Sequence, residues 1–162
     1  MYLNLPCNAF QTTMATYTGQ NVGAGRRDRV KTGVRQTMLM SLVMTTCISG
    51  IVWIFSDKII ALFALSEQAA TYCMSHVRTV ALINVILSAY IPLFGVFQGT
   101  NHSGVPTIVA TGALGVRVLV TYLFRYSSFF GYSIIWWNGL FGFGTGFLIS
   151  WTYYLSGRWQ KS

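Results

Sequence analysis

The side chains that could do chemistry are few and scattered. The 162-residue chain has three acidic residues, Asp28, Asp57 and Glu67, and two histidines, and none of them is spaced as a catalytic dyad, a nucleophile with its base or a metal-ligand cluster. Its three cysteines are an odd number, which does not suit a disulfide framework. The sequence therefore predicts no enzyme, no cofactor and no metal site.

Several polar side chains lie inside otherwise apolar stretches, where lipid would not solvate them. Such groups are expected to face the interior of a helix bundle. There they could line the path of a drug, or they could bond to neighbouring helices, and the sequence leaves both roles open. The candidate cavity residues are Gln11, Thr12, Asn84, Ser88 and Tyr90.

Arg117 is the one basic residue that stands deep within an apolar stretch. It lies about a dozen residues in, or about 18 Å along a helix. An arginine at this depth is costly in lipid and normally faces protein or water. It either contacts a substrate or a lipid headgroup, or it is a structural arginine that snorkels outward or bonds the carbonyls of a neighbouring helix.

The elements that position these residues are predicted to be membrane-spanning helices. Hydrophobic residues make up 53% of the chain and charged residues only 9%, which leaves too little polar surface for a soluble globule. A bilayer core of about 30 Å needs about 20 apolar residues in a helix. Four stretches meet this requirement, namely residues 37–55, 79–98, 105–124 and 134–154.

Residues 1–20 alternate polar and apolar side chains and are too polar to span alone, so they are expected to form part of a further helix. Short breaks at 23–25, 56–68, 99–104 and 127–131 separate the helices, and neighbouring spans must therefore run antiparallel. The whole chain, residues 1–162, is predicted to be one all-α polytopic membrane domain, a bundle with four full spans and a partial N-terminal helix.

The net charge of +8 is concentrated in one basic segment. Few aromatic side chains stand beside it to stack on bases, so nucleic acid is not an expected partner. Lys and Arg gather in the cytoplasmic loops of membrane proteins, and this segment falls on the same side of the spans as the C-terminal tail. The C-terminus is therefore predicted to be cytoplasmic. The basic segment comprises Arg26, Arg27, Arg29, Lys31 and Arg35.

The run Gly19-Gln-Asn-Val-Gly-Ala-Gly-Arg26, followed by Asp28-Arg-Val-Lys31, closely resembles the signature at the cytoplasmic end of a helix in each half of multidrug and toxic compound extrusion (MATE) transporters. Further segments are similar to the same family, although Asn101 stands where a glycine is common. They are Gly95-Val-Phe-Gln-Gly99 before Pro106, Arg117-Val118 and Gly157-Arg158-Trp159. The resemblance assigns a cytoplasmic signature loop to Gln20, Asn21, Gly23, Gly25 and Arg26.

This resemblance implies a protein of twelve helices in two six-helix lobes that exports drugs or organic cations in exchange for H+ or Na+. It maps the chain to the second part of the eighth helix through the twelfth, so that the N-terminal lobe would be a missing partner. The resemblance also implies localisation to the cytoplasmic membrane of a microbe. No coupling residue can be transferred, because the acidic residue that some members carry in the tenth helix has no counterpart in residues 79–98.

Two alternatives remain open. The chain could be a small membrane protein that self-associates into a channel or a dimeric exporter through Gly142 and Gly146, a small-xxx-small pair that is otherwise typical of ordinary helix packing. It could also be a non-transporting remnant of a truncated gene. A start at Met1 inside a helix favours a truncated reading frame over a small protein complete in itself.

Overall fold

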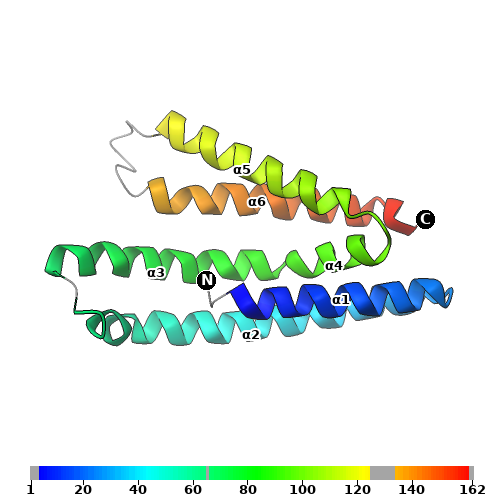
Figure 1. Ribbon diagram of the computed structural model, residues 1–162, viewed down its shortest axis with the longest axis horizontal. Coiled ribbons are helices and arrows are strands. Elements are labelled where there is room, and N and C mark those ends of the chain that lie inside the picture. The colour runs from blue at the N-terminus through cyan, green and yellow to red at the C-terminus, as the bar shows by residue number, and fades with distance from the viewer. Residues whose placement is uncertain (1–3, 65, 125–133, 161–162) are drawn as a thin grey trace.

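The computed structural model describes residues 4–64, 66–124 and 134–160. These residues form α-helices and one short 3-10 turn, and none of them lies in a strand, so the all-α prediction is confirmed (Figure 1). The elements in chain order are α1 (Leu5–Gly23), α2 (Arg27–Ala61), α3 (Glu67–Ser88), α4 (Ile91–Gly99), α5 (Gly104–Phe124), α6 (Ile134–Leu155) and η3 (Arg158–Gln160).

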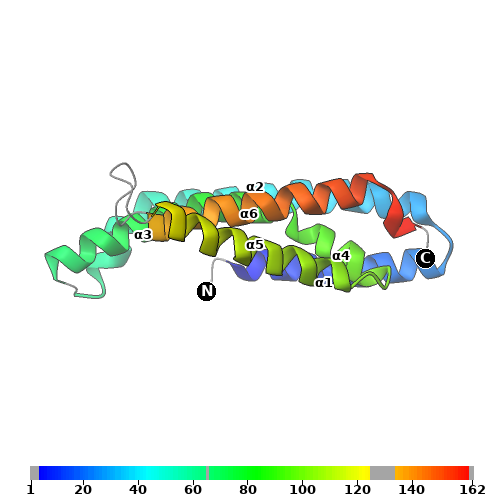
Figure 2. The ribbon, with the colours of Figure 1, turned by 90° about the horizontal axis from the view of Figure 1, so that it is seen from above.

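The helices form an elongated bundle in which consecutive helices α1 and α2, α2 and α3, and α5 and α6 run antiparallel, whereas α1 and α4 run parallel (Figure 1). The closest pairs are α1 with α4, α2 with α3, and α5 with α6. The α1–α2 turn, the α4–α5 turn and the C-terminus lie together at one end, while the α2–α3 connection projects beyond the other helices at the opposite end (Figures 1 and 2). The basic segment and the C-terminal tail are thus on the same side of the bundle, as predicted.

Three helical segments are long and apolar enough to cross a membrane: α2, the combined stretch Glu67–Gly99, and α5. They correspond to the first three predicted spans. The fourth predicted span, residues 134–154, is helix α6 with 22 residues. That length matches the bilayer core at about 1.5 Å per residue, but Asn138 and the glycines of α6 make it less apolar, and its crossing of the membrane stays a prediction.

Helix α2 differs from its prediction at both ends. It has 35 residues instead of the expected 37–55, and it therefore extends for about 52 Å, well beyond the hydrocarbon core. The basic segment is helical because Arg and Lys favour helix, and Asp28 complements the positive end of the helix dipole. The expected connector residues 56–58 are also helical, and the Ser56 hydroxyl donates to the Trp53 carbonyl within the helix over 2.9 Å.

The side of α2 that packs inside the bundle is small and polar, whereas its outer side is large and apolar. Ser41, Thr45 and Ser49 are buried at four-residue intervals, while Leu39 and Ile54 are 63% and 71% exposed. A soluble helix shows the reverse pattern. Small residues let membrane helices approach closely, and large apolar ones face lipid, so α2 has the surface of a helix in a bilayer.

The turn at residues 99–104 keeps the geometry that a glycine would give. Asn101 has a φ of 62°, in the left-handed region that asparagine tolerates better than most residues. The His102 amide donates to the Phe97 carbonyl over 2.7 Å and the Asn101 amide to the Gln98 carbonyl over 3.1 Å, which is the Schellman arrangement that ends a helix. Asparagine at this position therefore preserves the turn. The predicted turn at 127–131 lies outside the described residues.

Candidate functional site

The predicted cavity residues on α1 are polar groups on an open face of the bundle. The Gln11 side chain is half-buried, and its Nε2 donates to Oε1 of Gln98 on α4 over 3.3 Å. Thr12 is exposed, and its hydroxyl donates to the Asn8 carbonyl over 3.0 Å. Gln11 is thus joined to a polar residue of another helix, Gln98, that was not among the predicted cavity residues.

The other three predicted cavity residues are buried. Asn84, Ser88 and Tyr90 are 3%, 0% and 3% exposed. The Ser88 hydroxyl donates to the Val85 carbonyl over 2.7 Å, whereas the Asn84 side-chain nitrogen has no hydrogen-bond partner within the described part of the chain. Buried and exposed side chains do not line one open surface. The chain by itself therefore does not assemble the five residues into one cavity, and their role stays a prediction.

A break in the second predicted span lies among these buried residues. The sequence predicts one helix over residues 79–98, but α3 ends at Ser88 and α4 begins at Ile91. Pro92 stands in the first turn of α4, where its missing N–H costs no helical hydrogen bond and its ring blocks continuation of α3. The Ala89 carbonyl at the break accepts a hydrogen bond from Trp151 Nε1 on α6 over 3.2 Å.

Close packing of α1 on α4 brings Gln98 to Gln11. A Cβ on Gly95 would lie 2.9 Å from the Ala15 nitrogen and would clash with the Gln11 carbonyl, and one on Gly99 would lie 2.6 Å from the Ala15 carbonyl. Only glycine lets the two backbones approach this closely. The Gly95-xxx-Gly99 pair thus fixes the distance at which polar side chains of α1 and α4 meet.

Arg117 belongs to a polar cluster between α5 and α6. Its Nε donates to Oδ1 of Asn138 over 3.1 Å, and Asn138 Nδ2 donates to the Thr121 hydroxyl over 3.0 Å. The guanidinium also lies over the ring of Phe143, 5.6 Å from the centroid. The sequence left several roles open for Arg117. The structure supports a structural role, in which Arg117 bonds the neighbouring helix α6 through the Asn138 side chain rather than through a backbone carbonyl.

Gly142 and Gly146 are both used for packing inside the chain. The aliphatic stem of Arg117 occupies the place of a Cβ at Gly142, and the Tyr90 hydroxyl oxygen lies 3.0 Å from the corresponding position at Gly146. The packing role predicted for this pair is confirmed. The same face is therefore not free to form the dimer that the self-associating alternative requires.

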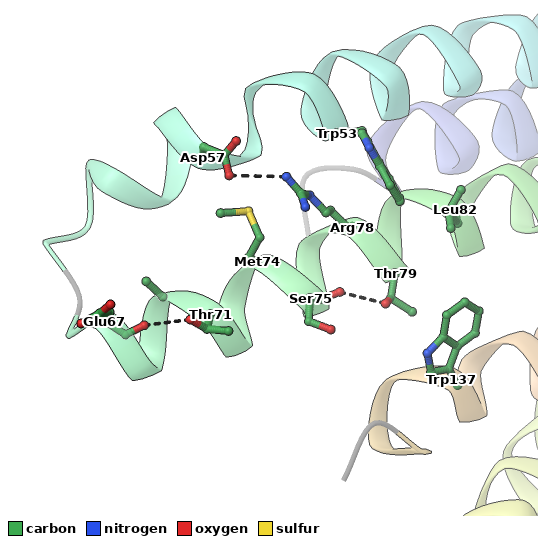
Figure 3. Close-up of a pocket in the computed structure, with 11 residues that line it drawn as sticks. Trp53, Asp57, Glu67, Thr71, Met74, Ser75, Arg78, Thr79, Leu82 and Trp137 are labelled. Atoms are coloured by element: carbon green, nitrogen blue, oxygen red, sulfur yellow. Dashed lines mark hydrogen bonds and ion pairs between the residues drawn. The ribbon is translucent and has the colours of Figure 1, made fainter. Parts of the chain in front are cut away.

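A cavity of about 630 Å³ lies at the end of the bundle where α2 and α3 meet. Arg78 is held there by Oδ1 of Asp57 over 3.4 Å and by the Ser56 hydroxyl over 3.2 Å, and its guanidinium lies 5.8 Å from the centroid of the Trp53 ring. Figure 3 shows Trp53 and Trp137 at one side of this space and Glu67 at the other. Asp57 and the Trp53 ring thus already contact a cation, Arg78, and the remaining groups of this space that could contact another cation are Glu67 and the Trp137 ring.

The predicted signature loop is a helix C-cap followed by a helix start. The Gly25 amide donates to the Val22 carbonyl over 2.9 Å, and the Arg26 amide to the Asn21 carbonyl over 2.8 Å. This is a Schellman motif with Gly25 at the left-handed position, φ 72°. Asn21 Nδ2 also bonds to the Tyr17 carbonyl over 2.8 Å. Gln20 accepts the Ala24 amide through its carbonyl over 3.1 Å, and Gly23 is the last residue of α1.

A match to the family described as MatE covers residues 1–123, which is most of the 162-residue chain. The chain belongs to the MatE family. The predicted resemblance is thereby confirmed. The family match and the three long apolar helices together indicate a multi-pass membrane protein.

Two curated relatives are similar to nearly the whole chain. The probable multidrug resistance protein NorM of Thermotoga maritima is 21% identical over 97% of this chain and 34% of its own length. The probable multidrug resistance protein YoeA of Bacillus subtilis is 21% identical over 94% of this chain and 33% of its own length. The chain thus spans about a third of the MatE relatives that it matches. No solved structure matches it.

The sequence did not single out the residues that line the α2–α3 cavity of this MatE chain. Their spacing holds a signal in retrospect, because Trp53 and Asp57 are four residues apart on α2 and Arg78 and Leu82 are four apart on α3, which places each pair on one helix face. The signal was missed because residues 56–58 were predicted to lie in a connector rather than in a helix.

Proposed function

We propose that this chain forms the C-terminal part of a MATE-type transporter that exports drugs or organic cations in exchange for H+ or Na+. The observation that carries the proposal is the MatE match over residues 1–123. Relatives named as multidrug resistance proteins support the substrate class. In this arrangement the chain works together with an N-terminal lobe, and the open face of α1, with Gln11 and Thr12, is turned toward that lobe.

The coupling ion is proposed to bind outside the membrane core of this chain. All three acidic residues lie near helix ends: Asp28 in the first turn of α2, Asp57 close to the end of α2, and Glu67 at the start of α3. A proton or sodium ion that drives transport needs a binding group within the membrane. We therefore assign that group to the N-terminal lobe.

The sidedness follows from the distribution of basic residues. The end of the bundle with the α1–α2 turn and the C-terminus holds the basic segment (Figure 1), and the excess of Lys and Arg favours the cytoplasm for that end. The α2–α3 cavity would then open on the outer side of a microbial cytoplasmic membrane. A cysteine-accessibility experiment on Ser162→Cys, in a background without the native cysteines, reports this orientation.

The decisive experiment is ethidium efflux from cells that lack their own pumps. One strain expresses the 162-residue chain and another expresses the same chain extended by the reading frame upstream of it. Efflux by the extended form alone supports the proposal. Efflux by the short chain itself would indicate a self-assembling exporter, and loss of efflux in both strains, with the proteins present in the membrane, would point to a non-transporting remnant.

A further inference from the structure

A second open cavity of about 470 Å³ lies between α2 and α6, near the basic end of the bundle. We call it the α2–α6 groove. The α2 side is contributed by Lys31, Val34, Arg35, Met38, Leu39 and Leu42. The α6 side is aromatic and consists of Phe147, Trp151 and Tyr154, and Ala89 also lines the groove. The groove belongs neither to the predicted substrate residues nor to the α2–α3 cavity.

The α2 side of the groove changes from cationic to aliphatic along one helix face. Lys31 and Arg35 are exposed and four residues apart, so both ammonium and guanidinium groups reach the same region. Met38 and Leu42 follow at the next turns of the same face. From Lys31 to Leu42 the helix rises about 16 Å, close to the depth of one leaflet, which is about half of a 30 Å core.

The α6 side is a pre-formed wall of contacting rings. Phe147 and Trp151 have centroids 6.1 Å apart, Trp151 and Tyr154 5.9 Å, and Tyr154 stacks on Trp159 at 5.4 Å. The Trp151 N–H is already bonded to the Ala89 carbonyl, so what this indole offers to the groove is its apolar surface. Rigid aromatic walls lose little conformational entropy when they contact a flexible chain.

Among the described residues, the two cations at the mouth of the groove have no acidic partner. All three acidic side chains belong to this described part, and the ion pair found there is that of Arg78 with Asp57 at the other end of the bundle. Asp28 stands one turn before Lys31 but makes no ion pair with it. Lys31 and Arg35 are both exposed, so a negative group from outside the protein can pair with them.

We propose that the α2–α6 groove binds an anionic phospholipid, with its phosphate on Lys31 and Arg35 and one acyl chain along Met38, Leu39 and Leu42. Charge complementarity selects the headgroup, because each cation near an anionic lipid surface adds to the attraction. The length of the apolar face selects a lipid over a free phosphate, which would use only the two cations. The inference requires that the chain lies in a bilayer, and it is independent of the transported substrate.

Native mass spectrometry of the full chain tests the headgroup assignment, with phosphatidylglycerol and phosphatidylcholine as the two probes. We expect selective retention of phosphatidylglycerol, and a loss of affinity on the order of twentyfold in K31Q/R35Q. The matched control R29Q/R158Q removes the same charge at the same end of the bundle but outside the groove, and should retain the lipid. Equal binding of both lipids, or equal loss in both double variants, would overturn the proposal.

A second pair of variants tests the position of the acyl chain. Leu42→Trp fills the groove, whereas Val43→Trp places the same ring on the neighbouring exposed position outside it. We expect weaker phosphatidylglycerol binding only in the first variant, and no displacement of the lipid by millimolar inorganic phosphate. Displacement by phosphate would show a site for a free anion. Equal binding by the two Trp variants, or no lipid retained because another helix covers the groove, would refute a lipid there.

Discussion

Trp151 on α6 donates its indole N–H to the carbonyl oxygen of Ala89 over 3.2 Å, at the break between α3 and α4. Backbone carbonyls released by a break inside a membrane have no water to bond to and need a protein partner. This one side chain therefore ties α6 to the interruption in the neighbouring span. It also explains how a membrane helix can be broken at this depth without an unpaired carbonyl at Ala89.

Replacing Trp151 by Phe should destabilise the bundle. The substitution keeps an aromatic ring but leaves the Ala89 carbonyl without its donor, so the free energy of unfolding should fall by about 1–3 kcal/mol. Unfolding in mixed micelles with increasing SDS measures this. Trp137→Phe is the control, because the Trp137 indole makes no hydrogen bond among the described residues. Equal stability of the two variants would show that the Trp151 bond does not hold the break.

Replacing Gly95 by Ala should separate α1 from α4. The new Cβ would meet the Gln11 carbonyl and lie 2.9 Å from the Ala15 nitrogen, and backbone atoms cannot move aside as a side chain can. Overpacking of this kind costs about 1–3 kcal/mol. The thermal midpoint in detergent should therefore drop. Gly115→Ala, where a Cβ meets nothing within 4 Å, should instead stabilise by up to about 1 kcal/mol; a similar drop in both would contradict this account.

The hydrogen bond between Arg117 and Asn138 should appear as an energetic coupling. In a double-mutant cycle of Arg117→Ala and Asn138→Ala, the interaction energy should be about 0.5–3 kcal/mol, because the two side chains share one network. Thr152→Val is the control partner, since Thr152 lies further along α6 and its hydroxyl donates to the Leu148 carbonyl of its own helix. Additivity of Arg117→Ala with Asn138→Ala would show that the cluster contributes nothing as a unit.

Gly25 should resist replacement while Gly23 tolerates it. A Cβ at either position would meet nothing within 4 Å, so crowding does not distinguish them. Gly25 has a φ of 72°, and the left-handed conformation costs a residue with a Cβ about 1–2 kcal/mol. Gly25→Ala should therefore lower the thermal midpoint, whereas Gly23→Ala, at the helical end of α1, should be neutral or stabilising. The opposite order would mean that the Schellman motif does not form in the membrane.

Much of the fold could be predicted because membrane helices are marked by length and apolarity, which are properties of the sequence alone. The end of α1 was placed correctly, since Gly23 and Gly25 encode the helix end locally. The break at Ala89 was missed because the span 79–98 was drawn from length and apolarity alone, and the effect of Pro92 was not considered. A proline at that position can bend a helix or begin a new one. The outcome depends on which group donates a hydrogen bond to the freed carbonyl, and here the donor is Trp151, 62 residues away in sequence.

The contacts of the candidate cavity residues were harder to predict, because they also depend on partners that are distant in sequence. Gln11 was predicted either to line a cavity or to bond a neighbouring helix. The structure shows its bond to Gln98, and the identity of that partner depends on how closely α1 and α4 approach. That distance is set by Gly95 and Gly99 acting together with Ala15. Asn84 and Ser88 were predicted to face inward, and they do, yet burial in this chain alone does not distinguish a cavity wall from a packed interior.

The small hydroxyl residues on the inner face of α2 bear on how this helix can change over evolutionary time. Its outward positions, such as Leu39 and Ile54, contact the surroundings and can exchange among large apolar residues with little effect. Ser41, Thr45 and Ser49 are limited by volume, so alanine or glycine should replace them more readily than leucine. Sequence variation along α2 should therefore follow side-chain size on one face and hydrophobicity on the other.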